Sequence, residues 1–519
     1  MSFISIEYAI FLIISVFLYY ICPKKFKWIV LLASSYIFYF LSSGKLLVFL
    51  LTSTISIYVS GLLIDRENIR TKLLGAELEK QEKKILKNKA KKRKKLIVFI
   101  SILINFGILA VLKYSGFACK NVNHILNIFN AEKIPVAKFI LPIGISYYTL
   151  MAVSYVVDVY RGKYEAEENL GKLALYLSFF PQIIEGPISK FDQTAQKLYE
   201  GNKFDIDNLL HGLSLILIGV FKKLVIADRA GIYVNNIFGT DSYGFAMFLG
   251  ALLYTLQIYA EFSGCMDIVI GSGELFGIVL PENFKRPFFS RSIQEFWRRW
   301  HITLGAWIKD YIFYPISLSG FNTKVGEFFT KYLPKGMAKF LVVAFPMLFV
   351  WLYNGIWHGA SWKYIAYGMY YYIVIMLGIL LAPLLSKIRE KLKINQENIF
   401  YKVYEILRTG LIVVIGMMLF RSHSFMAFIH NFINLFKKTN VDIVSFGLEK
   451  FDFIILILYV VILIILGIFQ EKNVVIYKEL RKKNVLIRYL LYILVILCIV
   501  ILGIYGKGYD TSSFIYGQF

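Results

Sequence analysis

Eleven runs of apolar residues, separated by short polar stretches, organise this chain. They cover residues 8–22, 28–41, 46–63, 96–112, 209–225, 245–269, 340–357, 367–385, 403–420, 453–469 and 489–504. An upright helix needs about 20 apolar residues to cross the hydrocarbon core. Several runs are shorter, so we expect some helices to tilt or the bilayer to thin around them. The pattern predicts an all-α integral membrane protein built as a multi-helix bundle.

Two further apolar segments, residues 139–159 and 173–184, are interrupted by prolines, a glycine and an amide. Irregular backbone at membrane depth is tolerated where protein buries it, so we expect re-entrant elements here. Neither a repeat nor a soluble domain is evident, which predicts one polytopic domain over residues 1–519. The first run has no basic region before it and no small-residue cleavage site after it, so we expect a retained helix.

Composition agrees with this class. Charged residues make up 18% of the chain and the mean hydropathy is +0.61, whereas a soluble domain carries about 25% charged residues. The four cysteines are scattered without metal-ligand spacing. They are best interpreted as small membrane residues, and no metal site is predicted.

The net charge of +24 is not spread evenly. Residues 65–95 contain 13 Lys and Arg against 5 Asp and Glu. Nucleic-acid binding is one interpretation, but the segment lies between two apolar runs. The positive-inside rule favours a cytoplasmic loop on anionic lipid, folded as a solvated helix, and no nucleic-acid partner.

Orientation follows from that loop. Three apolar runs precede it, which predicts an extracytoplasmic N-terminus. Residues 471–488 are again basic, so the run at 489–504 should lead outward. The C-terminal tail, residues 506–519, is then extracytoplasmic as well.

Two histidines lie among tryptophans: His301 follows Trp300, and His358 follows Trp357. An intramembrane histidine is a functional-site hypothesis by default, and its neutral ring accepts protons near pH 7. On a helix, Trp351, Asn354, His358 and Trp362 would share one face. That face would place the imidazole between two indoles, where burial keeps it neutral and able to act as a general base. A packed structural histidine is the alternative.

His301 lies in residues 293–307, which have the pattern of one amphipathic helix at a membrane interface. It could be a second catalytic group or could only orient helices. Arg298 and Arg299, off the apolar stripe, could bind the phosphates of a ligand, although snorkelling toward headgroups is commoner.

Uncharged hydrogen-bonding side chains complete the candidate site. Asn283, Gln182 and Gln257 suit a polar channel or the polarisation of a thioester carbonyl, and helix–helix hydrogen bonding explains them equally well. Asn354 and Trp357 would line the same channel beside His358.

Several other enzyme classes lose support. The chain has no Gly-x-Ser-x-Gly elbow, Walker loop or His-Glu-x-x-His helix. Asp205-Ile206-Asp207 could hold a metal for a membrane glycosyltransferase, but carboxylates at a helix N-terminus are the more economical interpretation. A polymer transporter or flippase would show paired half-chain repeats with broken helices, and none is found.

The chain resembles the membrane-bound O-acyltransferase (MBOAT) family, especially its bacterial branch of alginate O-acetylation and teichoic acid D-alanyl transfer proteins. The resemblance is carried by ordered blocks from about residue 140 onward. These blocks are residues 141–146 (LPIGIS), 157–162 (VDVYRG), 179–182 (FFPQ) with 186–188, 257–259 (QIY) with 262–264 (FSG), 281–284 (PENF) with 286–287, both histidine segments, 420–422 and 514–519 (FIYGQF). The chain departs from the family pattern at Glu261 and Cys265, where Asp and Tyr are usual.

The resemblance implies a bundle around a central funnel and an enzyme with His358 as its active-site residue and His301 as a second candidate. It implies acyl transfer from a cytoplasmic thioester, acetyl-CoA being favoured, with no permanently bound cofactor. The acceptor would be an extracytoplasmic polysaccharide or wall polymer, reached through an esterase-like serine partner outside the cell. D-alanyl transfer to teichoic acid is the runner-up. The resemblance also suggests Tyr516 as an acyl carrier, although the terminal aromatics could simply anchor the tail at the interface.

Overall fold

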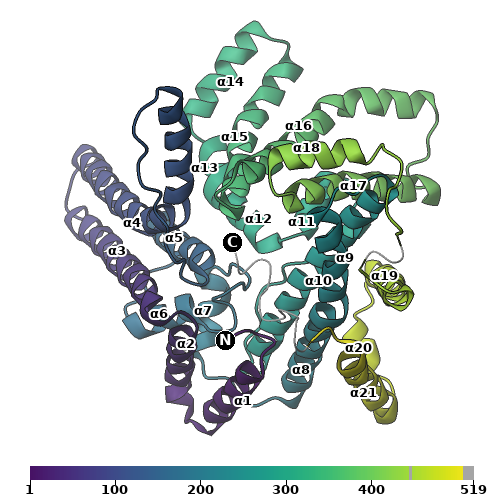
Figure 1. Ribbon diagram of the computed structural model, residues 1–519. Helices are drawn as coiled ribbons and strands as arrows, with labels where there is room; N and C mark the ends of the chain where they lie inside the picture. Colours follow the sequence, from purple (N-terminus) through teal and green to yellow (C-terminus); the bar gives the residue numbers. More distant parts are fainter. Residues whose placement is uncertain (444–446, 506–519) are drawn as a thin grey trace. The chain divides into compact units, whose positions relative to one another are not determined.

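The fold of the described chain is entirely helical. The computed structural model describes residues 1–443 and 447–505 (Figure 1). Within these ranges no strand forms, and the one isolated bridge joins Phe284 to Trp300. The predicted all-α membrane class is confirmed.

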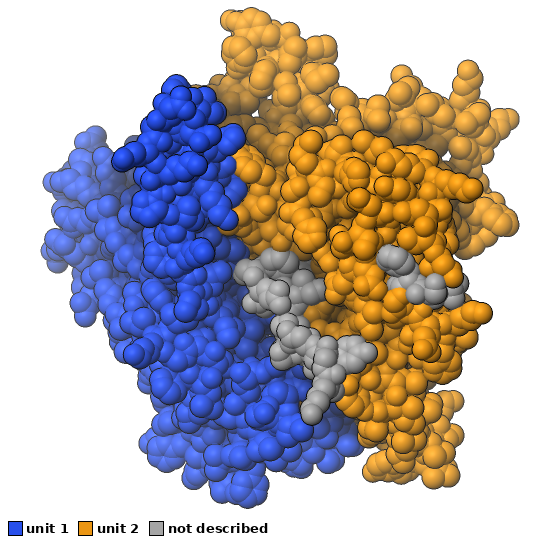
Figure 2. All heavy atoms as spheres, viewed as in Figure 1, with its two compact units in different colours: residues 1–213, 269–281 blue, residues 214–268, 282–519 orange. Residues whose placement is uncertain are grey.

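The chain divides into two compact units, coloured separately in Figure 2. Unit 1 comprises Met1–Leu213 and Val269–Pro281, and unit 2 comprises Ser214–Ile268 and Glu282–Phe519. Two long helices, α8 (Ile206–Phe221) and α10 (Phe245–Glu274), contribute residues to both units. Both candidate histidines belong to unit 2.

Unit 1 contains seven complete α-helices and two short 3-10 turns. They are α1 (Ile6–Ile21), η1 (Lys24–Phe26), α2 (Lys27–Ser43), η2 (Gly44–Leu46), α3 (Leu47–Leu74), α4 (Lys80–Ile128), α5 (Ile145–Arg161), α6 (Leu170–Ser178) and α7 (Phe191–Tyr199).

Unit 2 contains the remaining elements. They are η3 (Lys222–Ala227), α9 (Asp228–Gly239), η4 (Pro287–Phe289), α11 (Ile293–Arg299), α12 (Ile302–Ile308), η5 (Lys309–Phe313), α13 (Tyr314–Ser317), α14 (Gly320–Tyr332), α15 (Lys335–His358), α16 (Trp362–Lys391), α17 (Ile399–Arg421), α18 (Phe425–Asn434), α19 (Lys450–Glu471), α20 (Ile476–Arg481) and α21 (Val485–Leu502).

Nine helical segments of the described chain are long and apolar enough to cross a membrane. One of them, Lys24–Leu74, joins two of the predicted runs through the η2 turn. The first predicted run forms α1, whose 16 residues make a rod of about 24 Å, shorter than the roughly 30 Å hydrocarbon core. All eleven predicted runs therefore fall on helices, and the protein is a multi-pass membrane protein.

The two interrupted segments contain the largely buried helices α5 and α6, whereas Phe139 and Ile140, before α5, are exposed. Most side chains of α5 are buried, and α6 has only nine residues before the chain leaves the helical conformation. The following turn is held from within unit 1, since the Tyr176 hydroxyl donates to the Ser189 carbonyl at 2.9 Å. This is the environment that irregular backbone at membrane depth requires.

The basic segment at 65–95 is helical, as expected for a solvated charged run. α3 continues to Leu74, and α4 begins at Lys80 (Figure 1). One ion pair, between Arg93 and Glu67 at 3.4 Å, joins the two helices.

The Asp-x-Asp sequence lies at the start of α8. The Asp205 carboxylate accepts the backbone N–H of Asp207 at 2.7 Å, and Asp207 occupies the first turn. This is the helix-terminal arrangement that was expected. Among the described residues, no three His, Cys, Asp or Glu side chains gather to hold a metal ion.

Buried charges fix α10 within unit 2. The Lys223 ammonium lies 3.1 Å from the Glu261 carboxylate and 2.7 Å from that of Asp228, and Lys222 lies 2.6 Å from Asp267. Charges in such helices are costly unless paired, so these bonds hold η3 and α9 against α10. The same stretch of α10 carries side chains that contact His301.

Candidate active site

His358 is the last residue of α15, and a tight helical hairpin sets its position. α15 and α16 lie side by side in Figure 1. A Cβ on Gly355 would lie 2.3 Å from the Tyr364 carbonyl oxygen, and one on Gly368 would lie 2.2 Å from that of Trp351. Only glycine permits this approach of the two backbones. The hairpin therefore fixes the end of α15 against the first turns of α16.

The His358 imidazole is 3% exposed and enclosed by aromatic rings. Three rings meet it edge-on, from α15, α16 and α17: Trp357 at 5.0 Å, Tyr367 at 5.9 Å and Phe420 at 5.3 Å between centroids. A neutral ring is the state that a general base needs.

The predicted helical face around His358 is wrong at its last member. α15 ends at His358, and Trp362 begins α16, where its side chain is 60% exposed. The indole beside the imidazole is that of Trp357 instead. Asn354 does lie one turn before His358, and its buried Oδ1 accepts no hydrogen bond from the described part of the chain.

His301 occupies a break between two helices, so the single helix predicted over 293–307 is also wrong. α11 ends at Arg299, Trp300 is extended, and His301 adopts a left-handed conformation with φ of 49°. Backbone hydrogen bonds to the segment after α10 stabilise the break: Lys285 N–H donates to Arg299 and Ile302 N–H donates to Asn283, at 2.9 and 3.0 Å. Local periodicity carries no signal for this pairing with a distant segment.

Asn283 holds the His301 ring and sets its tautomer. Its Oδ1 accepts from the Thr303 backbone N–H at 3.0 Å and from the Thr303 hydroxyl at 2.9 Å. The backbone donor identifies this atom as the amide oxygen. His301 Nδ1, 3.3 Å from the same oxygen, must therefore be the protonated nitrogen. In the neutral ring, Nε2 then carries the lone pair.

Burial lowers the pKa of His301 to about 3. The side chain is 3% exposed, and the Phe262 ring of α10 meets it edge-on at 4.8 Å. Desolvation penalises the charged form of the imidazole. His301 is therefore neutral throughout the physiological pH range, and in this tautomer Nε2 is the ring nitrogen that has acceptor character.

Trp357 contacts both candidate histidines. Its ring centroid lies 5.7 Å from that of His301 and 5.0 Å from that of His358, so the two imidazole centroids lie within about 11 Å of each other. The structure thus brings together His301, Asn283, Trp357 and His358, four residues singled out from the sequence. They come from three separated segments of unit 2.

Arg298 and Arg299 differ in their contacts. Arg299 is bound to carboxylates, 2.6 Å from Glu471 and 2.7 Å from Glu295. Glu471 also binds Arg286 at 2.7 Å, so this network ties the helical break to the end of α19. Arg298 is exposed.

The remaining amides, Gln182 and Gln257, lie on other elements than the two histidines. Gln182 belongs to unit 1, where its Oε1 accepts from the Ser189 hydroxyl at 3.2 Å within the turn after α6. Gln257 of α10 packs against Gly231 of α9, where a Cβ would lie 2.8 Å from its Nε2. Tyr516 lies outside the described residues.

Two side chains near His301 were not predicted. Met266 of α10 accepts a hydrogen bond from Asn283 Nδ2 at 3.2 Å through its sulfur atom, and Phe262 packs on the imidazole. Both contacts depend on the backbone pairing between the segment after α10 and the break at His301. Their four-residue spacing on α10 marks a shared face, but nothing in it indicates what that face meets.

Comparison with known proteins decides the family. The family model for MBOAT, the membrane-bound O-acyltransferase family, matches residues 166–422, a range that includes both histidines and Asn283. The chain is 32% identical over 417 residues to a probable alginate O-acetylase of Pseudomonas syringae pv. tomato, covering 80% of this chain and 71% of the relative. This chain belongs to the MBOAT family. It is an O-acyltransferase, as the family name states.

Two other kinds of relative match this MBOAT chain. A peptidoglycan O-acetyltransferase of Helicobacter pylori is 32% identical over 306 residues, covering 53% of this chain and 54% of the relative. A teichoic acid D-alanyltransferase of Bacillus subtilis is 30% identical over 239 residues, covering 45% and 57%. The three relatives are named for acyl transfer, two of them for acetyl transfer.

The hydrogen bonds of Asn283 predict a positioning role. Asn283→Leu keeps the approximate volume but strands the buried donors of His301 and Thr303, at a cost of about 1–3 kcal/mol in stability. Acyl transfer by this MBOAT variant should fall at least tenfold. Asn283→Asp retains the acceptor and should recover more activity than the Leu variant at equal thermal stability.

The aspartate variant gives a second readout. A carboxylate beside His301 favours the imidazolium and raises the pKa of the ring. The acidic limb of the pH–activity profile should therefore move to higher pH in Asn283→Asp. Equal activity in both variants, with unshifted profiles, would show that Asn283 serves the fold alone.

Proposed function

We propose that this chain transfers an acetyl group from cytoplasmic acetyl-CoA to a hydroxyl group, for O-acetylation of an extracytoplasmic polysaccharide or wall polymer. The observation that carries the proposal is the pair of buried imidazoles joined by Trp357. The names of the alginate and peptidoglycan relatives support acetyl as the group and a polymer as the acceptor.

Acyl transfer from a thioester needs a base more than it needs an acid. The thioester is already activated, and the barrier lies in deprotonating a hydroxyl nucleophile. In the proposed step, neutral His358 takes the hydroxyl proton while the oxygen forms a bond to the thioester carbonyl carbon. The carbon–sulfur bond then breaks, and the coenzyme A thiolate receives the proton from His358. The aromatic walls of the site limit competing hydrolysis by water.

His301 has a different role in this proposal. Its Nδ1 proton is committed to Asn283, so Nε2 acts as an acceptor. An acceptor cannot stabilise an oxyanion, but it can orient the hydroxyl by accepting its hydrogen bond. We therefore assign His358 to proton transfer and His301 to positioning of the nucleophile.

D-alanyl transfer is the second candidate, because the teichoic acid D-alanyltransferase also matches. The two activities leave different ester-linked groups on the polymer. Mild base releases either acetate or D-alanine, and the identity of the released group distinguishes them. The proposed activity predicts acetate.

Delivery outside the cell is proposed to proceed through Tyr516 and an extracytoplasmic esterase-like partner. The Tyr516 oxygen would take the acetyl group as a phenyl ester and pass it to the partner's serine. Phenolate, with a pKa near 10, leaves far more readily than an alkoxide. Tyr516→Phe keeps the ring as an interfacial anchor but removes the nucleophile. We expect polymer acetylation to be lost, with an acetyl adduct on wild-type Tyr516 when the partner is absent. Full acetylation by the variant would leave the tail as an anchor only.

The proposed orientation has its own test. Cysteines introduced at Lys89 and at Ser512, in a background lacking Cys22, Cys119, Cys265 and Cys498, should be labelled from opposite sides of intact cells. The basic segment makes Lys89 cytoplasmic, so an impermeant thiol reagent should modify position 512 and not position 89. The reverse labelling would overturn the orientation.

A further inference from the structure

A lysine-lined cavity lies between the extended ends of α3 and α4. Its volume is about 600 Å³, and every residue that lines it belongs to unit 1. The lining residues are Asn68, Thr71 and Lys72 of α3, Lys83, Lys87, Ala90, Lys91 and Lys94 of α4, and Tyr160 of α5. We call it the lysine cavity.

The spacing of the lining residues along each helix places them on the face that lines the cavity. On α4 the four lining lysines, at 83, 87, 91 and 94, follow one another by three or four residues, so they share one face. The lining positions of α3 lie within about one turn of each other. Ala90, also in the lining, is buried.

The charge of the cavity is not balanced by its own walls. Five lysines line it, and no carboxylate occurs among its lining residues. On the same two helices, Arg93 lies outside the cavity and is paired with the Glu67 carboxylate at 3.4 Å. Like charges gathered around a hollow repel one another unless an anion lies between them.

One lysine is held ready for such an anion. The Lys94 ammonium donates to the Asn68 amide oxygen at 2.7 Å and lies 5.9 Å from the Tyr160 ring centroid. Two of its three N–H donors remain for a ligand. From Lys94 to Lys83 the face extends about 17 Å along the helix, which is longer than a single phosphate can contact.

The position of the cavity suits a phosphorylated ligand. Lys94 lies two residues before the apolar run that begins at Leu96, and Asn68 follows the apolar part of α3. The inner end of the cavity is therefore level with lipid headgroups, and its outer end reaches into water.

We propose that the lysine cavity binds an anion with two or more phosphate groups. Phosphate oxygens are strong acceptors for ammonium donors. A diphosphate lipid headgroup and a soluble polyphosphorylated molecule share this chemistry, and the two are separable by experiment. The proposal is independent of acyl transfer.

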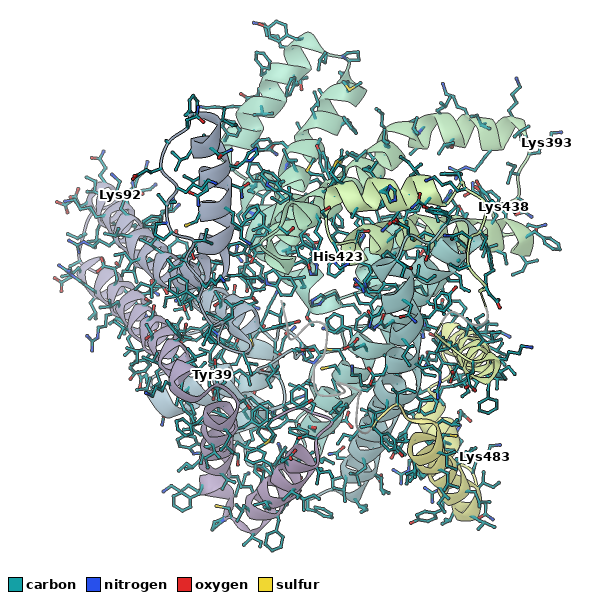
Figure 3. The ribbon with its side chains drawn as sticks, in the orientation of Figure 1. Tyr39, Lys92, Lys393, His423, Lys438 and Lys483 are labelled. Carbon is teal, nitrogen blue, oxygen red and sulfur yellow. The ribbon has the colours of Figure 1, made fainter. Side chains whose placement is uncertain are left out.

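The test uses the full-length protein in neutral detergent and two probes. Cardiolipin binding is measured by native mass spectrometry, and inorganic pyrophosphate binding by isothermal titration calorimetry. The cavity variant is Lys87→Gln with Lys91→Gln. The matched control is Lys89→Gln with Lys92→Gln, which removes the same charge from positions of α4 outside the cavity lining; Lys92 is labelled in Figure 3.

We expect the wild type and the control to bind at least one probe, and the cavity variant to bind it at least tenfold more weakly. Binding of cardiolipin alone assigns the site to a headgroup, and binding of pyrophosphate alone assigns it to a soluble ligand. Equal weakening in both variants would reduce the effect to general charge attraction and overturn the proposal. So would the absence of binding by both probes.

Discussion

Cells that carry His358→Ala in place of the native chain should lose at least about 10²–10⁴-fold in acyl transfer while inserting the protein normally. The reason is the position of the ring: buried, fixed by the α15–α16 hairpin and enclosed by three aromatic rings. Alanine removes the only atom proposed to take the nucleophile's proton. The measurement is ester-linked acyl release from the envelope, normalised to the amount of protein in the membrane.

A histidine outside the candidate site provides the control for this experiment. His423, labelled in Figure 3, is exposed in the segment after α17. His423→Ala should retain wild-type transfer at the same abundance. Wild-type activity in His358→Ala would remove His358 from the chemistry.

His301→Gln should also abolish most transfer, by a route that leaves the fold intact. Glutamine is polar but does not reproduce the ring nitrogen Nε2, which is proposed to orient the nucleophile while Nδ1 contacts Asn283. Because His301 has a positive φ, glutamine adds backbone strain, and His301→Asn, a residue that tolerates this conformation better, serves as the companion variant. Both should lose more activity than any fall in their thermal stability in detergent explains. Activity that falls only in step with stability would make His301 structural.

The low pKa of His301 adds a pH test of the same variant. The folded-state pKa of about 3 lies below the ordinary value of 6.5, so protons bind preferentially to the unfolded state. The stability contributed by neutral His301 is complete above pH 6.5 and is lost as the pH falls toward 3. Near pH 5 the loss is about 2 kcal/mol. The parent's melting temperature should therefore fall more steeply than that of His301→Gln between pH 6.5 and 4; parallel curves would contradict the buried neutral state.

The helices were predictable because membrane burial imposes long apolar runs. Each of the eleven runs falls on a helix, and the interrupted segments became the short elements α5 and α6. The lipid environment requires each span to satisfy its own backbone, so the signal is local. Local signals are what a sequence carries most clearly.

The sequence singled out residues that gather in the structure, but it did not predict the geometry that brings them together. His301, His358, Asn283 and Trp357 gather, yet the break before His301 depends on backbone hydrogen bonds from Lys285 and to Asn283, which lie in another segment. Periodicity alone extends the helix through that break. Periodicity also extends the helix beyond His358. Trp362 is exposed because α15 ends at His358 and Trp362 begins α16.

The contacts of the polar side chains depend on ionic and hydrogen-bonding partners that the sequence pattern does not reveal. Arg299 looked suited to phosphate, but Glu471, more than 150 residues later, takes its guanidinium. Gln182 looked suited to a channel, but Ser189 in the adjoining turn takes its amide oxygen. Tertiary hydrogen bonds decide such roles, and spacing along the chain does not record them.

The measurement that tests the central claim most directly is the ester content of envelope polymers in a deletion strain. Polymers from the parent strain, the deletion strain, and the deletion strain complemented with either the wild-type chain or His358→Ala are treated with mild base, and the released groups are identified by mass spectrometry. Acetyl transfer predicts acetate from the parent and the wild-type complement, and its loss from the deletion and His358→Ala strains. Unchanged acetate release in all four strains would contradict it.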